Sequence, residues 1–208
     1  METKTKQLKK DLLTWYTDNK RSFSWRNTND PWKILLIEII SQQTQINRAD
    51  TYYEKFIKRF PTPESMSKSS LKTILKMWSG LGYNNRAKRL YESSKLLAEQ
   101  GFEGIYPNFE ILPGVGPYTK NAILSFAYGD NVLAVDTNLQ RIIIRYFGID
   151  NTKDYLREYS DLLLESIKSE DLNQAFMDFG SSICTSSNTK CDICPLEKNC
   201  KKYFVNSK

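Results

Sequence analysis

The stretch Ile111-Leu-Pro-Gly-Val-Gly-Pro-Tyr-Thr119 puts two glycines one residue apart, shortly before an apolar run over residues 122–127. Glycine permits a close approach of the backbone, and Pro117 suits the first turn of a following helix. The free amides at such a helix start attract phosphate oxygens. The pattern predicts a turn between two helices, although most Gly-x-Gly turns are only tight connections.

On both sides of this stretch the chain is dominated by amphipathic runs separated by short Gly, Pro, Asn and Ser breaks. The apolar period predicts helices over residues 8–19, 49–60, 70–78, 85–99, 139–146 and 155–168. Only residues 131–135 have an extended pattern, which is too short and too isolated to support a sheet. The sequence therefore predicts an all-α fold.

The composition narrows the classes of function. The 208-residue chain carries a net charge of +6, which suits a polyanionic partner without establishing one. No apolar stretch is long enough to span a bilayer and no signal peptide is present, so we expect a cytoplasmic protein without a membrane partner. The chain has no histidine, so acid-base chemistry must use carboxylates, Lys, Tyr or Cys.

All the cysteines of the chain lie in one segment near its C-terminal end, at Cys184, Cys191, Cys194 and Cys200. Six, two and five residues separate them in turn. This clustering indicates a metal centre, and the intracellular location that we expect argues against disulfides. Four thiolates suit structural zinc or a 4Fe-4S cluster, and residue chemistry alone leaves both open.

Two carboxylates stand in unequal surroundings. A helix predicted to start at Asp30 carries Glu38 within the apolar run 34–40, where desolvation would raise the pKa of Glu38 and let it hold a proton. The alternative is a buried structural Glu paired with Arg. Asp136 precedes the predicted helix 139–146, where an Asp most often caps the helix and stays ionised. Glycosidic cleavage requires one protonated and one ionised carboxyl group.

From about residue 12 to Cys200 the chain resembles the catalytic portion of the adenine DNA glycosylases, within the helix-hairpin-helix superfamily of endonuclease III. The most discriminating stretch is Glu38-Ile-Ile-Ser-Gln-Gln-Thr-Gln45, which is similar to the family's catalytic Glu followed by its Gln-Gln-Thr-Gln signature. The cysteine spacing resembles the superfamily's 4Fe-4S loop. The resemblance implies a monofunctional DNA N-glycosylase of base excision repair, a monomer that removes adenine mispaired with guanine or oxidised guanine from double-stranded DNA.

The resemblance assigns the chemistry to four residues. Glu38 protonates adenine N7. Asp136, in a stretch similar to the family's Asp-Gly-Asn, stabilises the sugar cation or bonds to it transiently, with Asn138 as its polar support. Tyr118 stands where the bifunctional relatives have a nucleophilic lysine, which implies hydrolysis without strand cleavage.

The resemblance also implies a set of side chains that contact the bases or fill the stack: Trp25, Arg26, Ser41, Gln42, Gln43, Tyr83 and Asp178. Trp25 and Tyr83 could instead be core aromatics. Ser41 stands where the family usually has Leu, and Asn84 replaces the second Tyr of its Gly-Tyr-Tyr. The shape of the pocket and the opposite base are therefore less determined than the chemistry.

By the same resemblance the hairpin grips the DNA backbone through Gly114, Gly116 and Thr119, often with a bound monovalent cation. A helical barrel domain is expected over residues 28–133, and an iron-sulfur domain over residues 1–27 and 134–208. The chain resembles a short form without the family's additional C-terminal domain that reads oxidised guanine.

Three other functions remain in view. Archaeal thymine mismatch glycosylases share the fold, the cluster and a Tyr at the position of Tyr118, but lack the Gln-Gln-Thr-Gln signature, so thymine or uracil opposite guanine is the second candidate. A bifunctional endonuclease III type is disfavoured by Tyr118. A non-catalytic iron-sulfur DNA-binding protein would have no need for both Glu38 and Asp136.

Overall fold

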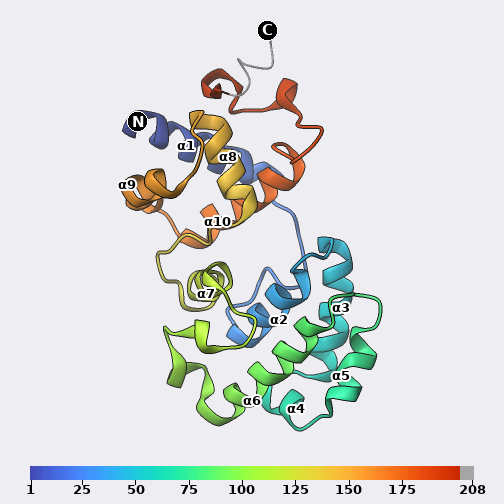
Figure 1. The fold of residues 1–208 in the computed structure, drawn as a ribbon. Coiled ribbons are helices and arrows are strands. Elements are labelled where there is room, and N and C mark those ends of the chain that lie inside the picture. The colour runs from blue at the N-terminus through green and yellow to red at the C-terminus, as the bar shows by residue number, and fades with distance from the viewer. Residues whose placement is uncertain (202–208) are drawn as a thin grey trace. The chain divides into compact units, whose positions relative to one another are not determined.

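The computed structural model describes residues 1–201 as helices grouped into two compact units, residues 1–21 with 131–201 and residues 22–130 (Figure 1). These residues contain no β-strand, so the predicted all-α fold is confirmed. No helix among them combines the length and the apolar character that a membrane span requires.

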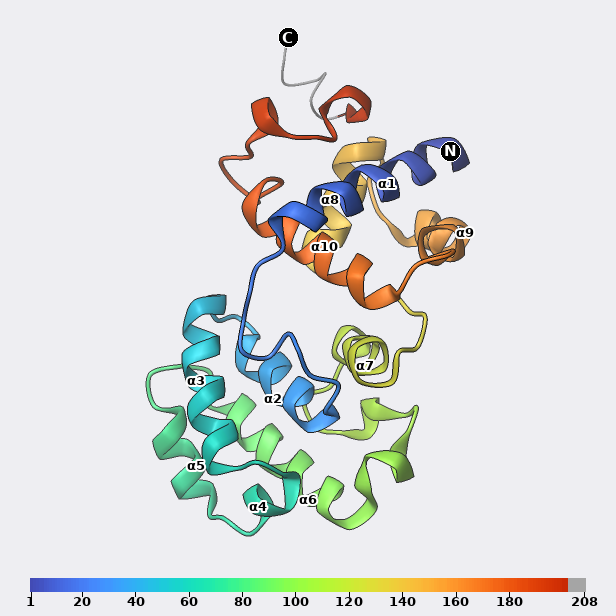
Figure 2. The same cartoon turned by 180° about the vertical axis from the view of Figure 1, so that it is seen from behind.

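The unit of residues 22–130 is built around α2 (Pro31–Ser41), whose side chains from Trp32 to Ile40 are nearly all buried. Asp30 caps this helix by accepting hydrogen bonds from the amides of Trp32 and Lys33. The elements that pack against α2 are α3 (Ile46–Arg59), α6 (Asn85–Ile105), α7 (Pro117–Ile123) and the π-helical turn η2 (Leu124–Tyr128). Figure 2 shows α2 between α3 and α7, while α4 (Pro63–Ser67) and α5 (Leu71–Trp78) pack on α6.

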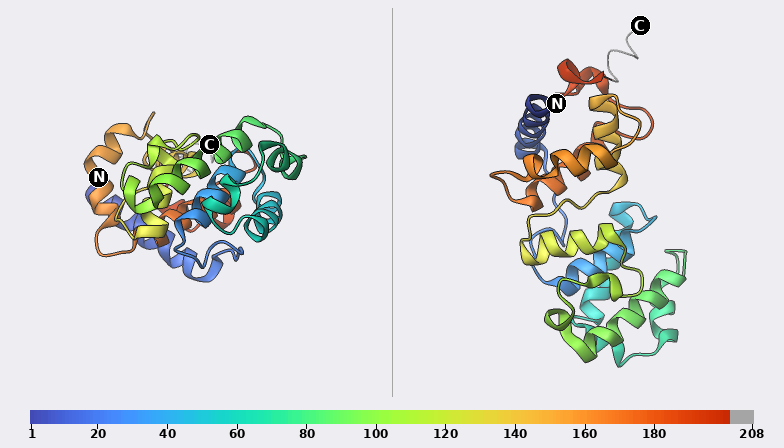
Figure 3. Two further views of the ribbon diagram at one scale, coloured as in Figure 1. Left: turned by 90° about the horizontal axis from the view of Figure 1, so that it is seen from below. Right: turned by 60° about the vertical axis from the view of Figure 1, so that its left-hand side comes forward.

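The other unit contains four longer helices: α1 (Glu2–Asn19), α8 (Thr137–Phe147), α9 (Lys153–Leu164) and α10 (Ser169–Ser182). Helix α10 packs against α1 and α8, and α1 also packs against α9 (Figure 3). The core side chains are buried aliphatic and aromatic residues from all four helices, and Trp15 meets Phe179 edge to face at 5.0 Å between ring centroids. Two short 3₁₀ turns, η3 (Cys191–Ile193) and η4 (Glu197–Asn199), lie in the cysteine segment.

The extended residues 131–135 are held by one side chain rather than by a strand. Asn173 Nδ2 donates to the carbonyl of Val132, and Asn173 Oδ1 accepts from the amide of Ala134, each over 3.0 Å. A side-chain amide offers the same donor and acceptor as a peptide group, so it satisfies the backbone that a neighbouring strand would satisfy. This segment leads directly into Asp136.

Some expected helix limits are wrong. The run 155–168 ends at Leu164, because Ser166 has a positive φ of 60° and Ser169 starts a separate helix. The run 85–99 continues to Ile105 through a kink at Gly101, whose φ is 67°. The apolar run 122–127 lies mostly in the π-helical turn.

Candidate functional site

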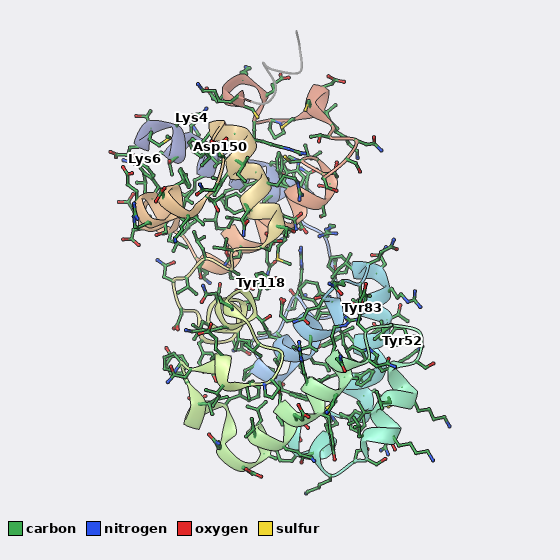
Figure 4. The ribbon with its side chains drawn as sticks, in the orientation of Figure 1. Lys4, Lys6, Tyr52, Tyr83, Tyr118 and Asp150 are labelled. Carbon is green, nitrogen blue, oxygen red and sulfur yellow. The ribbon has the colours of Figure 1, made fainter. Side chains whose placement is uncertain are left out.

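A polar pocket of about 690 Å³ lies within the unit of residues 22–130, between the end of α2 and the start of α6. It is lined by amide, guanidinium and phenol groups, those of Gln42, Gln43, Tyr83, Asn84, Asn85, Arg86 and Arg89. The structure thus brings together three residues that the sequence analysis selected, Gln42, Gln43 and Tyr83. Tyr83 is 66% exposed, so it is a surface aromatic and not part of the core (Figure 4).

Glu38 lies in the same unit, on α2, and is only 5% exposed. The residues on both sides of it, from Ile34 to Ile40, are almost wholly buried apolar side chains. Ser41, one turn further along, is half-buried, and its Oγ donates to the Glu38 carbonyl over 3.1 Å. The prediction that an apolar helix buries a carboxyl group is confirmed.

Asp136 is the N-cap of α8 in the other unit. Its Oδ1 accepts from the amide of Leu139 over 2.7 Å, and its Oδ2 accepts from Asn138 Nδ2 over 2.6 Å. Burial raises the pKa of Asp136 above its ordinary value of 3.8, and these hydrogen bonds and the nearby charge of Arg141 oppose that rise. The predicted capping role is confirmed, while the raised pKa was not expected from the sequence.

Arg141 extends this hydrogen-bonded chain, and the sequence analysis missed it. Its Nη2 donates to Asn138 Oδ1 and to the Gly180 carbonyl, both over 2.7 Å, and its Nε donates to the Cys184 carbonyl over 2.8 Å. A Cβ on Gly180 would lie 2.5 Å from the Asn138 Cβ, so α8 and α10 meet too closely here for any larger residue. The Asp136 side chain is therefore backed by a fixed network.

Asp178 is fully buried on α10. It binds Arg21, whose backbone amide donates to Oδ2 over 3.0 Å and whose Nε donates to Oδ1 over 2.6 Å. Arg21 was also missed, and the only signal in the sequence is its place shortly before Trp25. A buried carboxylate is stable only when it is paired and hydrogen-bonded in this way.

Trp25 and Arg26 lie at the start of the unit of residues 22–130 and are 6% and 9% exposed. The Trp25 ring stacks on Phe23 at 5.3 Å, and the Arg26 guanidinium lies over both rings. The indole Nε1 of Trp25 is buried and has no hydrogen-bond partner among the described residues. Such an unsatisfied donor marks a place where a ligand acceptor can bind.

The glycine turn leads into α7 as the sequence predicts, but the element before it is the short 3₁₀ turn η1 (Phe109–Ile111) and not a full helix. Gly114 has a positive φ of 89°, and a Cβ there would meet Arg89 and Ile39 at 3.2 and 3.3 Å. Gly116 is the extended N-cap of α7, and Thr119 in its first turn is 3% exposed. Gln42 Nε2 donates to the Gly114 carbonyl over 3.2 Å, which ties the turn to the polar pocket.

Tyr118 is half-buried on the same helix, α7 (Figure 4). Two residues further on, Lys120 Nζ lies 3.1 Å from Glu110 Oε2 in an ion pair. Tyr118 thus places a phenol, and not an amine, in the first turn of α7. Lys120, on the same helix, is paired with Glu110.

The four cysteines lie in the unit of Asp136, and none forms a disulfide. Burial raises the pKa of Cys194 to about 12, and the charges of Cys184, Cys191 and Cys200 add to that rise. Arg145 Nη1 lies 3.5 Å from Cys184 Sγ, and Cys200 Sγ lies 3.5 Å from the Arg145 carbonyl. The thiols therefore share one neighbourhood, although within residues 1–201 no group of three or more His, Cys, Asp or Glu is placed to hold a metal ion.

Comparison with known proteins shows the family to which the chain belongs. Residues 36–166 match the family model of the HhH-GPD superfamily base excision DNA repair proteins. The chain is 42% identical over 204 residues to the adenine DNA glycosylase of Buchnera aphidicola subsp. Baizongia pistaciae, which covers 94% of this chain and 58% of the relative. The chain thus spans less than two thirds of the length of that relative.

Two solved structures have a similar fold. A thermostable thymine-DNA glycosylase superposes with a TM-score of 0.88 and 32% identity, over 98% of each chain. An endonuclease III in a non-covalent DNA complex superposes with a TM-score of 0.82 and 20% identity, over 100% of this chain and 98% of that one. The second likeness shows the fold alone.

Proposed function

Because the chain belongs to the HhH-GPD superfamily of base excision DNA repair proteins, we propose that it hydrolyses the N-glycosidic bond of adenine mispaired with guanine or oxidised guanine. The observation that carries this proposal is the stretch Glu38–Gln45, which puts a buried carboxyl group a few residues before Gln42 and Gln43 at the polar pocket. The identity to an adenine DNA glycosylase over 94% of this chain supports it.

Glu38 is the proton donor in this proposal. A buried carboxyl group keeps its proton more readily than one in water, and can deliver it to adenine N7. Protonation at N7 lets the base leave as a neutral molecule when the C1′–N9 bond breaks. The electron pair of that bond goes to the base, and the sugar becomes an oxocarbenium-like cation.

Asp136 supplies the negative charge that this cation needs. Its carboxylate is oriented by Asn138 and by the Leu139 amide, so little reorganisation is needed when charge develops on the sugar. Water then adds to C1′ and leaves an abasic site. Tyr118 cannot form an imine, so the strand stays intact.

The remaining residues hold the extruded adenine and the distorted duplex. An enzyme that acts on a stacked base must extrude it at a cost of a few kcal/mol, and needs side chains to fill the gap. Gln42, Gln43 and Tyr83 fit that role because they line one pocket and Tyr83 is exposed. Trp25, Arg26, Ser41 and Asp178 are the proposed adenine contacts, and the unpaired indole Nε1 of Trp25 offers a donor.

The glycine turn and the cysteine segment are proposed as the anchors on DNA. Gly114, Gly116 and Thr119 bring backbone amides close to a phosphate, where a monovalent cation can also bind. Cys184, Cys191, Cys194 and Cys200 are the proposed ligands of a 4Fe-4S cluster, which their spacing of six, two and five residues supports. When bound, such a cluster would tie the segment together through its four thiolate ligands.

The predicted division of the chain into two domains is part of the same proposal. It assigns residues 28–133 to a barrel domain that carries the turn, and residues 1–27 and 134–208 to an iron-sulfur domain. The monomeric state, the cytoplasmic location and double-stranded DNA as the partner belong to it as well.

A second candidate, thymine or uracil opposite guanine, is favoured by one observation. The thermostable thymine-DNA glycosylase matches 98% of this chain at 32% identity. The stretch Glu38–Gln45 favours adenine, because it resembles the signature of the adenine enzymes.

The test is a single-turnover excision assay on duplexes with A:G, A:oxidised-G, T:G and U:G pairs. We expect cleavage of the A-containing duplexes after alkali, with little product from T:G and U:G. Excision of thymine or uracil alone would establish the second candidate. Tight DNA binding without any excision would establish a non-catalytic protein.

A further inference from the structure

Arg86, near the start of α6, is a buried cation whose hydrogen bonds go to backbone carbonyls and one hydroxyl. It is 5% exposed, and no carboxylate pairs with it among the described residues. Its guanidinium lies over the rings of Trp78 and Tyr83, at 5.2 and 5.8 Å from their centroids. Arginine suits such a place because its fork of donors serves several acceptors at once.

One set of acceptors belongs to the end of α2. Arg86 Nη1 donates to the carbonyls of Ile39 over 3.3 Å and Ile40 over 2.9 Å, and also to the carbonyl of Gln42 and the Thr44 hydroxyl. The last carbonyls of a helix have no intrahelical donor and carry partial negative charge. Arg86 therefore closes α2 and fixes the turn that follows it.

The other set belongs to the loop before α6. Arg86 Nη2 donates to the carbonyls of Leu81 over 3.2 Å and Gly82 over 3.3 Å. These residues directly precede Tyr83, just as Gln42 directly precedes Gln43. One guanidinium thus holds both segments that line the polar pocket.

Both segments contain a strained residue next to an acceptor of Arg86. Gln43 has a φ of 53° and Tyr83 a φ of 47°, and neither is glycine. Residues other than glycine rarely adopt this left-handed conformation, and they keep it only where the surroundings enforce it. The two strained residues both line the pocket.

We infer that Arg86 is a positioning residue, which presets Gln43 and Tyr83 as wedges for the gap that base extrusion leaves. The inference rests on the proposed function, because only an enzyme that extrudes a base needs such wedges. Presetting them removes the ordering cost that two mobile side chains would add on binding. Direct contact of Arg86 with DNA is not required, since both of its Nη groups already bind protein acceptors, while its buried Nε has no partner among the described residues.

The test measures extrusion separately from chemistry. In a Glu38→Gln background, 2-aminopurine replaces the adenine opposite guanine, and its fluorescence reports unstacking. Arg86→Met should lower the extruded fraction at least about tenfold, because the carbonyls of both loops lose their buried donor. Arg86→Lys keeps the charge with fewer donors, so it should give an intermediate loss and also serves if the Met variant fails to fold. Lys95→Met, on an exposed part of α6, is the matched control and should change nothing.

A double-mutant cycle separates positioning from general damage to the fold. Once Gln43→Ala and Tyr83→Ala remove the wedges, Arg86→Lys should cost little more, because residues that act as a unit are non-additive. The inference is overturned if Arg86→Lys leaves the extruded fraction unchanged. It is also overturned if Arg86→Lys causes the same fold-loss in the Gln43→Ala, Tyr83→Ala protein as it does when both wedges are present. If the Glu38→Gln protein with Arg86 unchanged gives no fluorescence rise, and the wild type excises no base, the proposed function is overturned and the inference falls with it.

Discussion

Asn138 donates a hydrogen bond of 2.6 Å to Asp136 Oδ2, so the carboxylate is oriented by a neighbour two residues along the chain. This bond lowers a pKa that burial raises. We predict that Asn138→Ala moves the acid limb of the excision rate to higher pH, because the ionised form of Asp136 loses a donor. Single-turnover rates from about pH 4 to about pH 9 on an A:G duplex measure this limb, because carboxyl groups ordinarily titrate at the acid end of that range.

The raised pKa of Asp136 also makes the free energy of unfolding depend on pH. The pKa of Asp136 is higher in the folded chain than its ordinary 3.8, so the ionised form is disfavoured by folding. Ionisation of Asp136 therefore lowers the free energy of unfolding. This loss is absent below pH 3.8, where the carboxyl group is protonated in both states, and complete above the raised pKa of the folded chain. If the acid limb of the excision rate has the same midpoint pH in Asn138→Ala as in the wild type, Asp136 does not govern that limb.

A second prediction concerns Gly180, which lies against Asn138. In most helix interiors, replacing Gly by Ala stabilises by about 1 kcal/mol. Here the added Cβ would lie 2.5 Å from the Asn138 Cβ, so Gly180→Ala should instead destabilise by about 1–3 kcal/mol and slow excision by displacing Asn138. Thermal unfolding and single-turnover excision measure the two effects.

Gly104→Ala is the matched control for this substitution. Gly104 lies in α6, and the nearest heavy atom to an added Cβ is the Gln100 Cβ at 3.8 Å, which is an ordinary contact. It should therefore be neutral or slightly stabilising. Equal behaviour of the two variants would refute the close approach of α8 and α10.

The sequence predicted the all-α class, the superfamily and the caps at Asp30 and Asp136, because these depend on local patterns and ordered motifs. It also predicted that α2 buries Glu38, since a helix that is apolar on every face has no solvent side. The proposed roles of the site residues stay predictions.

The residues that the sequence did not reveal act through tertiary contacts. Arg21, Arg86 and Arg141 each bind groups that are distant in the chain, and a lone arginine in a basic sequence carries no local signal of this. The positive φ of Gln43 and Tyr83 was equally hidden, because propensity assigns that conformation to Gly or Asn.

Glu38→Gln tests the proton donor. Gln keeps the shape of the side chain but cannot donate the required proton, so excision should fall at least about 100-fold while DNA affinity stays close to wild type. Rates come from single-turnover excision and affinities from gel shift on the same A:G duplex. Near wild-type excision by this variant would remove Glu38 from the mechanism.

The cysteine segment predicts the metal content of the purified protein. Protein purified without oxygen should be yellow-brown and contain about four irons per chain, as expected for a 4Fe-4S cluster. Cys194→Ser should lower the iron content. It should weaken DNA binding strongly while changing the melting temperature only slightly. Stoichiometric zinc without iron would identify the site as structural zinc instead.

The final prediction concerns strand cleavage. In the bifunctional enzymes that this chain resembles, a lysine amine attacks the sugar and forms a Schiff base, whose elimination breaks the strand. The resemblance puts Tyr118 at that position here, and a phenol cannot form an imine. The wild-type product should therefore need alkali or heat for nicking, and borohydride should trap little covalent complex.

Tyr118→Lys should gain both nicking and trapping, because it places an amine at the lyase position of α7. Lys120 is the natural control, since it is on the same helix but about 200° around the axis from Tyr118. Its ammonium also pairs with Glu110 over 3.1 Å. The double variant Tyr118→Lys, Lys120→Ala should trap as well as Tyr118→Lys alone. Efficient trapping of the wild-type chain that Lys120→Ala abolishes would instead make the protein bifunctional, with Lys120 as its nucleophile.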